Sequence, residues 1–230
     1  MENNLVYTVE NATKETENVV TLTLTSETEL PNFRAGQFIT VFFPETVHAE
    51  GKSYSISKVV GKNIFEITVK GIGEFSNRLI KMKTGDKVTA SLPYGYFYSE
   101  STTSPLVMIA GGIGIAPFRA TLVESLELYP ERELVIFYSS KTVPDIIFRK
   151  EFDELLKNGK SKIKYHVTNG GAGGEVKKGR IPVEDIIEVS KNLKDAEFFI
   201  CGSIPFVRDF WKGLKQGGIE EERLYTEAFF

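Results

Sequence analysis

The chain has 230 residues, which is enough for one large domain or two smaller ones. Its 28 Lys and Arg residues against 31 Asp and Glu residues give a formal net charge of -3, which argues against a nucleic-acid-binding protein. A single cysteine, Cys201, excludes an internal disulfide and an iron–sulfur cluster held by these residues, and two histidines supply a zinc site poorly. We therefore expect no bound metal.

The first ten residues are polar and lack the basic start and apolar stretch of a signal peptide. No apolar run approaches the roughly 20 residues that a membrane-spanning helix needs. We therefore expect a cytoplasmic protein without membrane insertion, and we expect it to be a monomer.

The first hundred residues are typical of short strands. In 20–25 and 65–70, apolar residues alternate with polar ones, which is the pattern of half-buried strands. Glycine, proline and asparagine mark turns between the apolar segments. The pattern predicts an antiparallel β-barrel. Its expected strands include 20–25, 37–44, 53–60 and 65–70.

A stretch rich in serine and threonine at 99–105 marks the expected boundary between a first domain, 1–100, and a second, 101–230. Beyond it, apolar strands alternate with helices, which predicts a parallel sheet covered by helices on both faces. Ligands of such sheets bind at the carboxyl ends of the strands. The expected strands are 106–110, 134–138, 163–167, 198–201 and 224–230, and the expected helices are 117–129, 145–157, 183–189 and 205–215.

The strongest local signal is an apolar strand that runs into a glycine cluster and then into a helix. Gly111, Gly112 and Gly114 let the backbone approach a pyrophosphate, and the following helix start supplies free N–H groups. Pro117 stands where the usual G-x-G-x-x-G fingerprint has its last glycine. Taken alone, the glycines serve a plain strand–helix junction equally well.

Two further segments can bind a flavin. Lys52, Tyr54 and Ser55 place a cation, an aromatic ring and a hydroxyl at the start of a strand, although an exposed barrel face has the same composition. Glycines at 71–73 precede Ser76 at a predicted helix start, which is typical of an anion-binding turn or of an ordinary helix cap.

Two segments near the end of the chain complete the set. Cys201 and Gly202 follow an apolar strand and open a helix, although a buried cysteine is most often a small apolar core residue. At the end of the chain, Glu227 precedes Phe229 and Phe230, two aromatic residues that either cover a planar ring or complete the core.

Taken in order, these segments resemble the ferredoxin–NADP reductase family, which includes cytochrome b5 reductases and the reductase modules of oxygenases. The resemblance covers nearly the whole chain. It implies an N-terminal antiparallel Greek-key β-barrel that binds FAD, followed by a Rossmann-like α/β domain with a parallel five-stranded sheet that binds NAD(P)H.

On the barrel side, the resemblance assigns flavin contacts to three segments. They are the family's Arg-x-Tyr-Ser motif, the strand that follows it, and the pyrophosphate-binding turn. The matching positions are Lys52, Tyr54 and Ser55, then Thr68 and Lys70, then Phe75 and Ser76. Lys52 replaces the usual arginine, and lysine lacks the planar bidentate grip on phosphate, which bears on FAD retention.

On the nucleotide side, the glycine cluster matches the family's dinucleotide motif, with Ile113 in place of the common threonine. The Cys-Gly motif implies a sulfur near the nicotinamide, and the C-terminal end implies an aromatic ring over the flavin. Cys201 and Glu227 would position the nicotinamide or handle a proton. The matching positions are Gly111, Gly112 and Gly114, then Cys201 and Gly202, then Glu227, Phe229 and Phe230.

The resemblance implies an oxidoreductase that moves a hydride from NAD(P)H to FAD and electrons onward to an acceptor. Ser139, Ser140 and Lys141, with Arg149 nearby, favour NADPH because no acidic residue stands there to bind a ribose hydroxyl, although exposed lysines are usually only solvated. The expected acceptor is a protein: a ferredoxin, a flavodoxin or an oxygenase component. A free-flavin reductase and an electron-transfer subunit of a larger complex remain alternatives.

Overall fold

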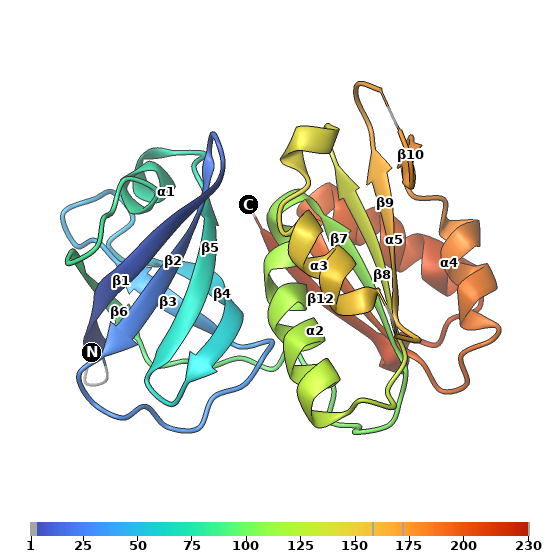
Figure 1. The fold of residues 1–230 in the computed structure, drawn as a ribbon, viewed down its shortest axis with the longest axis horizontal. Helices are drawn as coiled ribbons and strands as arrows, with labels where there is room; N and C mark the ends of the chain where they lie inside the picture. Colours follow the sequence, from blue (N-terminus) through green and yellow to red (C-terminus); the bar gives the residue numbers. More distant parts are fainter. Residues whose placement is uncertain (1–3, 158, 172, 230) are drawn as a thin grey trace. The chain divides into compact units, whose positions relative to one another are not determined.

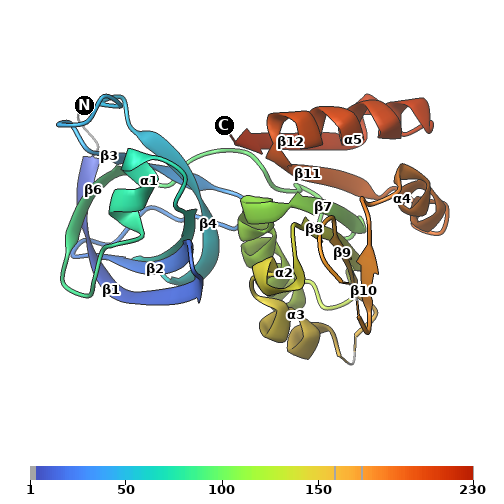
Figure 2. The same cartoon turned by 90° about the horizontal axis from the view of Figure 1, so that it is seen from above.

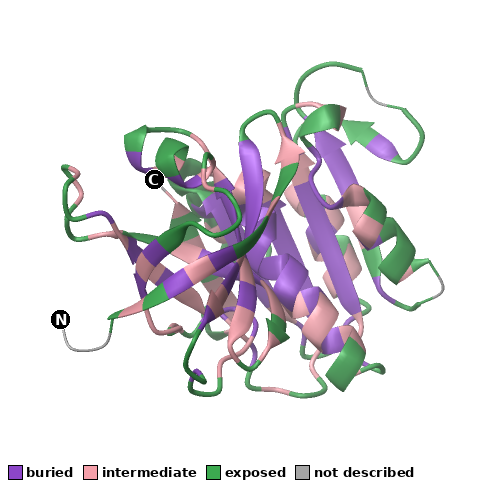
Figure 3. Cartoon of the chain, turned by 60° about the vertical axis from the view of Figure 1, so that its left-hand side comes forward, coloured by how far each residue is buried: buried purple, intermediate pink, exposed green. Residues whose placement is uncertain are grey.

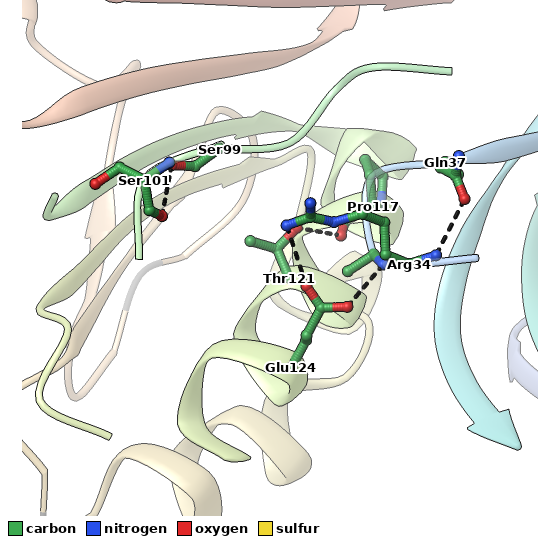
Figure 4. Close-up of polar contacts among 8 residues, drawn as sticks. Arg34, Gln37, Ser99, Ser101, Pro117, Thr121 and Glu124 are labelled. Atoms are coloured by element: carbon green, nitrogen blue, oxygen red, sulfur yellow. Dashed lines mark hydrogen bonds and ion pairs between the residues drawn. The ribbon is translucent and has the colours of Figure 1, made fainter. Parts of the chain in front are cut away.

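The computed structural model describes residues 4–157, 159–171 and 173–229. These residues form two compact units (Figure 1). The first extends to Tyr98 and also includes Ala116–Glu124, and the second contains Ser99–Ile115 and the chain from Ser125 onward. The stretch that starts the second unit is locally bonded: the Ser99 hydroxyl donates to the Ser101 carbonyl at 3.1 Å (Figure 4).

The first unit is built on a closed six-stranded barrel in which all neighbouring strands are antiparallel. The strand order is β1-β2-β5-β4-β3-β6, so β2 lies beside β5 and β6 beside β3, which is a Greek key. This confirms the predicted barrel, and β1 and β6 are additional to the four predicted strands. The elements are β1 (Asn4–Thr16), β2 (Val19–Ser26), β3 (Phe38–Phe42), β4 (Lys52–Gly61), β5 (Ile64–Lys70), α1 (Glu74–Leu79) and β6 (Lys87–Ser91).

The barrel core follows from the alternation in the sequence. Phe65, Ile67 and Val69 of β5 are fully buried in one apolar cluster, because successive side chains of a strand point to opposite faces. The cluster continues through β2, and it includes Phe75 and Leu79 of α1. Figure 3 shows the buried positions alternating along the strands of the barrel. The short helix α1 is therefore anchored to the barrel by its apolar face.

The second unit contains a six-stranded sheet in which all strand pairs are parallel. The order is β10-β9-β8-β7-β11-β12. The predicted number of five strands is too small, because β10 has only three residues in a glycine-rich segment and shows no alternation of its own. The strands are β7 (Leu106–Gly111), β8 (Leu134–Ser140), β9 (Lys162–Val167), β10 (Val176–Lys178), β11 (Glu197–Ser203) and β12 (Leu224–Phe229).

Helices cover both faces of this sheet, as predicted (Figure 2). One face is packed against α4 and α5 through a buried apolar cluster that also contains Val107, Ile109 and Phe137. The predicted helix 145–157 begins later, because Phe148 has a left-handed φ of 60° directly before its first residue. The helices are α2 (Ala116–Leu128), α3 (Arg149–Leu156), α4 (Val183–Ser190) and α5 (Ile204–Gln216).

The first half of α2 packs against barrel residues within the first unit. Phe118 lies 5.8 Å from Phe97, measured between ring centroids. The Glu124 carboxylate accepts a hydrogen bond of 3.0 Å from the Ala35 N–H and lies 4.0 Å from the Arg34 guanidinium (Figure 4). These contacts fix this half of the helix at both of its ends.

Among the described residues, no helix combines the length and the apolar character needed to cross a membrane. Within the same part of the chain, no three His, Cys, Asp or Glu side chains are grouped so that they could hold a metal ion.

Candidate functional site

Phe75 is the centre of the predicted flavin-binding region on the barrel. Its ring lies 6.5 Å from that of Tyr54 in a stacked arrangement and 4.7 Å from that of Phe43. The Lys52 ammonium lies 5.9 Å from the Phe75 ring centroid. The structure thus brings Lys52, Tyr54 and Phe75 together, although they come from β4 and α1. Phe75 itself is only 2 % exposed, so its position suits supporting Lys52 and Tyr54 rather than facing a ligand.

Lys52, Tyr54 and Ser55 lie along the first residues of β4, which pairs with β3. The Lys52 side chain is exposed, Tyr54 is half-buried and Ser55 is buried. Burial raises the pKa of the Tyr54 phenol well above its usual range, so this group stays protonated. An exposed cation, a flat ring and hydroxyls on one strand form a donor set that fits a flavin with its phosphates.

Thr68 lies inside a buried hydroxyl network. Its hydroxyl donates to Ser57 at 2.8 Å and lies 3.0 Å from the Thr21 hydroxyl, which donates to Glu15. These bonds connect β4, β5 and β2, so Thr68 holds the strands together. Lys70 is half-buried at the end of β5. Direct contact of Thr68 and Lys70 with the flavin stays a prediction.

Ser76 lies at a helix start, as predicted. Helix α1 starts at Glu74 with Gly73 as its N-cap, so Ser76 is the third residue of the first turn. Its hydroxyl oxygen accepts the N–H groups of Ile72 at 2.9 Å and Gly73 at 3.2 Å. Ser76 therefore stabilises its own turn, and two of the N–H groups that the turn offers are already satisfied.

The glycine turn of the second unit has the geometry of a backbone cradle. Gly112 has a φ of 57°, and a Cβ placed on it would meet no atom within 4 Å. The backbone is therefore uncovered at Gly112. Gly114 is closely approached instead: a Cβ there would lie 2.2 Å from the Cys201 carbonyl oxygen. The turn forms a 3₁₀ helix, Gly112–Ile115, that leads directly into α2, so its N–H groups and the helix start fit a pyrophosphate.

Phe206 of α5 covers two of the predicted glycines. A Cβ on Gly111 would lie 2.9 Å from the Phe206 ring, and one on Gly202 would lie 2.8 Å from it. Both positions therefore need glycine because an aromatic ring lies against the carboxyl ends of β7 and β11. Phe206 is half-buried, and nothing in the sequence marks it as part of this site.

Cys201 and Glu227 are neighbours in the register of β11 and β12, as the prediction of a joint role requires. Cys201 is fully buried, and burial raises the pKa of its thiol, with the Glu227 carboxylate adding to the effect. The thiol is therefore neutral and unsuited to act as a nucleophile. Glu227 is half-buried and lies near the carboxyl end of β12, the end of such strands at which ligands bind.

The C-terminal aromatic residues are described in part. Phe229 pairs in register with Ser203 and is half-buried. Phe230 lies outside the described residues.

The residues predicted to select the coenzyme separate into two groups. Ser139 is half-buried at the end of β8, beside Gly111 in register, and Lys141 is exposed in the loop that follows. Ser140 is turned away, because its hydroxyl donates to the Asp145 carbonyl at 3.2 Å. The Arg149 guanidinium lies 3.6 Å from Asp153 within its own helix. Ser139 and Lys141 therefore remain the candidates for contact with the coenzyme.

His166 is a second residue of this edge that the sequence does not reveal. It lies between Ser139 and Lys177 in the register of the sheet and is 2 % exposed. Neither ring nitrogen has a hydrogen-bond partner among the described residues. Burial is the main cause that lowers the pKa of the imidazole, and Lys177 lowers it further; Asp185 opposes this, and Lys164 adds the smallest lowering effect.

We expect His166 to make the protein less stable in mild acid. In the native state the imidazole is neutral, whereas in the unfolded chain it gains a proton near a pKa of about 6.5. The unfolded state therefore binds more protons below this pH, and the free energy of unfolding falls as the pH drops from 7.5 to 6. Denaturant unfolding at several pH values should show the fall, and His166→Leu should flatten it. The control His48→Gln, at a histidine whose side chain is 42 % exposed, should leave the slope as it is. An unchanged slope in His166→Leu would contradict the assignment.

Comparison with known proteins extends these observations. Residues 6–98 match the model of the oxidoreductase FAD-binding domain, and residues 108–212 match that of the oxidoreductase NAD-binding domain. The flavohemoprotein of Bacillus subtilis is 30 % identical over 209 residues, which cover 87 % of this chain and 52 % of that protein. A component of the Na(+)-translocating NADH-quinone reductase of Haemophilus influenzae is 27 % identical over 165 residues, 68 % of this chain and 40 % of that protein. The chain spans about half the length of the curated relatives it matches.

Solved structures share the fold. The FAD/NAD-binding domain of nitric oxide dioxygenase from Vibrio cholerae superposes with a TM-score of 0.87 at 21 % identity, covering 99 % of both chains. A ferredoxin NADP+ reductase from Neisseria gonorrhoeae, solved with bound FAD and NADP, superposes with a TM-score of 0.83 at 21 % identity, covering 100 % of both.

An FAD-binding barrel followed by an NAD-binding α/β unit defines a class of flavin-dependent oxidoreductases that use a nicotinamide coenzyme. Within this class, the chain belongs to the ferredoxin–NADP reductase family. It contains both the FAD-binding domain and the NAD-binding domain of such oxidoreductases.

Proposed function

We propose that this chain transfers a hydride from NADPH to FAD and then passes electrons to a separate protein carrier, such as a ferredoxin, a flavodoxin or an oxygenase component. The main support for this proposal is that one chain contains both the barrel cluster around Lys52 and Tyr54 and the glycine turn beside Cys201. We further propose that 1–100 form the FAD domain and 101–230 the NAD(P) domain.

The residues of the chain contribute binding and orientation. When bound, FAD accepts a hydride and releases electrons one at a time, which is chemistry that side chains cannot supply. Lys52 offers its charge to the flavin phosphates, and Tyr54 offers a flat ring. Gly112 and the start of α2 receive the coenzyme pyrophosphate. Cys201, with its neutral thiol, and Glu227 orient the nicotinamide. Phe229 limits access to the flavin ring.

An external protein acceptor is supported by the composition and by the relatives. The single cysteine leaves this chain without ligands for an iron–sulfur cluster, so electrons must leave from the flavin. The relatives are proteins about twice this length, and their names, a flavohemoprotein and a component of a quinone reductase, each indicate an electron acceptor other than the flavin. A free-flavin reductase would hold its flavin loosely, and this difference separates the two functions.

The test is the visible spectrum of the purified chain, followed by anaerobic titration with NADPH and NADH. We expect flavin absorption that stays with the protein on gel filtration and bleaches at stoichiometric coenzyme. Subsequent transfer to an added ferredoxin or flavodoxin should reoxidise the flavin. Flavin lost on the column, with activity restored by free flavin alone, would favour a free-flavin reductase. Failure to bind flavin at all would contradict the proposal.

Lys141 should set the preference for NADPH. Its ammonium is exposed beyond the end of β8, and a charged contact with a 2′-phosphate contributes about 1.5–3 kcal/mol. Lys141→Ala should therefore raise the KM for NADPH about tenfold or more and leave that for NADH nearly unchanged. Lys162→Ala is the matched control, because Lys162 is also exposed but lies at the opposite end of the sheet, where β9 begins. Equal effects on both coenzymes would contradict the role.

A further inference from the structure

A buried ion pair connects helix α2 to the barrel. The Arg119 guanidinium donates to the Glu66 carboxylate through Nη1 and Oε2. The two side chains are 9 % and 17 % exposed, so water screens their attraction only weakly. The residues are 53 positions apart in the sequence, and both belong to the first compact unit.

Each residue of this pair lies close in the sequence to a predicted cofactor-binding residue. Glu66 lies two residues before Thr68 on β5, and because a strand alternates its faces, both side chains leave the same face. Arg119 lies five residues after Gly114, near the start of the helix that follows the glycine turn. The pair therefore joins the strand with the predicted flavin contacts to the helix that starts at the predicted pyrophosphate cradle.

Two other contacts hold the same half of α2. Phe118 packs against Phe97, and Glu124 accepts the Ala35 N–H and lies near Arg34 (Figure 4). The apolar contact and the second carboxylate maintain the attachment of the helix if the ion pair is removed. The ion pair itself, with a directional bond between charged groups, defines where along β5 the helix start lies.

We propose that Arg119 and Glu66 are positioning residues for hydride transfer: their ion pair fixes the start of α2 to β5 within the first unit. This inference rests on the proposed function. A buried ion pair adds little net stability compared with an apolar pair of similar size, so stability alone does not account for its presence. Hydride transfer is sensitive to such geometry, since a displacement of about 1 Å can cost up to a hundredfold in rate.

The experiment measures flavin reduction by rapid mixing with increasing coenzyme, which separates the limiting rate from the half-saturation concentration. The main variant is the double substitution Glu66→Leu with Arg119→Met, which removes both charges and leaves neither buried alone. We expect normal FAD content, a half-saturation concentration within about twofold of wild type, and a limiting rate lowered about tenfold. Arg119→Lys keeps the positive charge opposite Glu66, so its limiting rate should lie between that of the double variant and that of wild type. Lys160→Met, at the exposed pair with Glu131, is the control and should behave as wild type.

A second readout does not depend on turnover. Hydrogen exchange of the FAD-free protein should show faster exchange in the first turns of α2 for the double variant, with unchanged exchange in β11 and α5. A double variant that reduces its flavin at the wild-type rate would overturn the inference. A wild-type protein that binds no flavin, or whose flavin neither coenzyme reduces, would instead contradict the proposed function, so the two failures are distinguishable.

Discussion

Gly114→Ala should lower coenzyme-dependent flavin reduction by about a hundredfold, because the new Cβ displaces the turn that receives the coenzyme. At this position a Cβ would lie 2.2 Å from the Cys201 carbonyl oxygen and 2.5 Å from its carbon. Both atoms are backbone atoms of a central strand, so they cannot rotate away as a flexible side chain would. The turn must move instead, and the overpacking should also cost about 1–3 kcal/mol of stability.

Rapid-mixing kinetics and denaturant unfolding of Gly114→Ala measure the two effects. FAD content should stay normal, because the flavin-binding residues lie on the barrel. Gly171→Ala is the control, since a Cβ there meets nothing within 4 Å and its φ is not in the left-handed region. A Gly114→Ala protein with wild-type rate and stability would show that the turn tolerates the displacement and would contradict the cradle.

Lys52→Ala should weaken FAD binding by about tenfold to a hundredfold, which corresponds to the 1.5–3 kcal/mol of a charged hydrogen bond. The Lys52 side chain is exposed and its ammonium lies 5.9 Å from the Phe75 ring centroid, so its removal leaves no buried cavity. Lys52→Arg should strengthen binding, because a guanidinium can grip a phosphate with two hydrogen bonds. The changes are measured by titrating FAD into FAD-free protein and following flavin fluorescence.

The matched control for Lys52 is Lys62→Ala. Lys62 is on the same barrel and highly exposed, with its ammonium 3.3 Å from the Glu29 carboxylate. Its removal should leave the FAD affinity unchanged. If Lys52→Ala and Lys62→Ala bind FAD equally well, then Lys52 does not hold the phosphates, and the barrel retains its flavin through Tyr54 and the turn at α1.

Period-two alternation made the barrel strands predictable. Segments 20–25 and 65–70 each bury their apolar residues on one face, so their alternation reveals both the strand and its orientation, although Thr21 and Thr68 on the other face are buried as well. The strand, glycine turn and helix around Gly112 were also predictable, because few residues other than glycine adopt the left-handed φ of 57° at this position. In contrast, β10 has only three residues and forms by pairing with the edge of β9, for which its own sequence carries no pattern.

Parts of the site depend on contacts that no local pattern encodes. The Ser76 hydroxyl accepts the N–H groups of Ile72 and Gly73. The sequence around Ser76 is the same for a helix cap and for an anion-binding turn, so it could not predict this outcome. Arg119 and Glu66 meet only because the chain folds, and each taken alone is an ordinary charged residue. His166 shows the same limit, since its burial comes from neighbouring strands.

The Phe206 ring has a consequence for how related sequences can diverge. Because it occupies the space where side chains at Gly111 and Gly202 would lie, these three positions cannot vary independently. A homologue with alanine or serine at either glycine should carry a smaller residue in place of Phe206. If the glycine is substituted while Phe206 is still present, the intermediate protein should be less stable. Coordinated change at these three positions is therefore the expected evolutionary signature of this cradle.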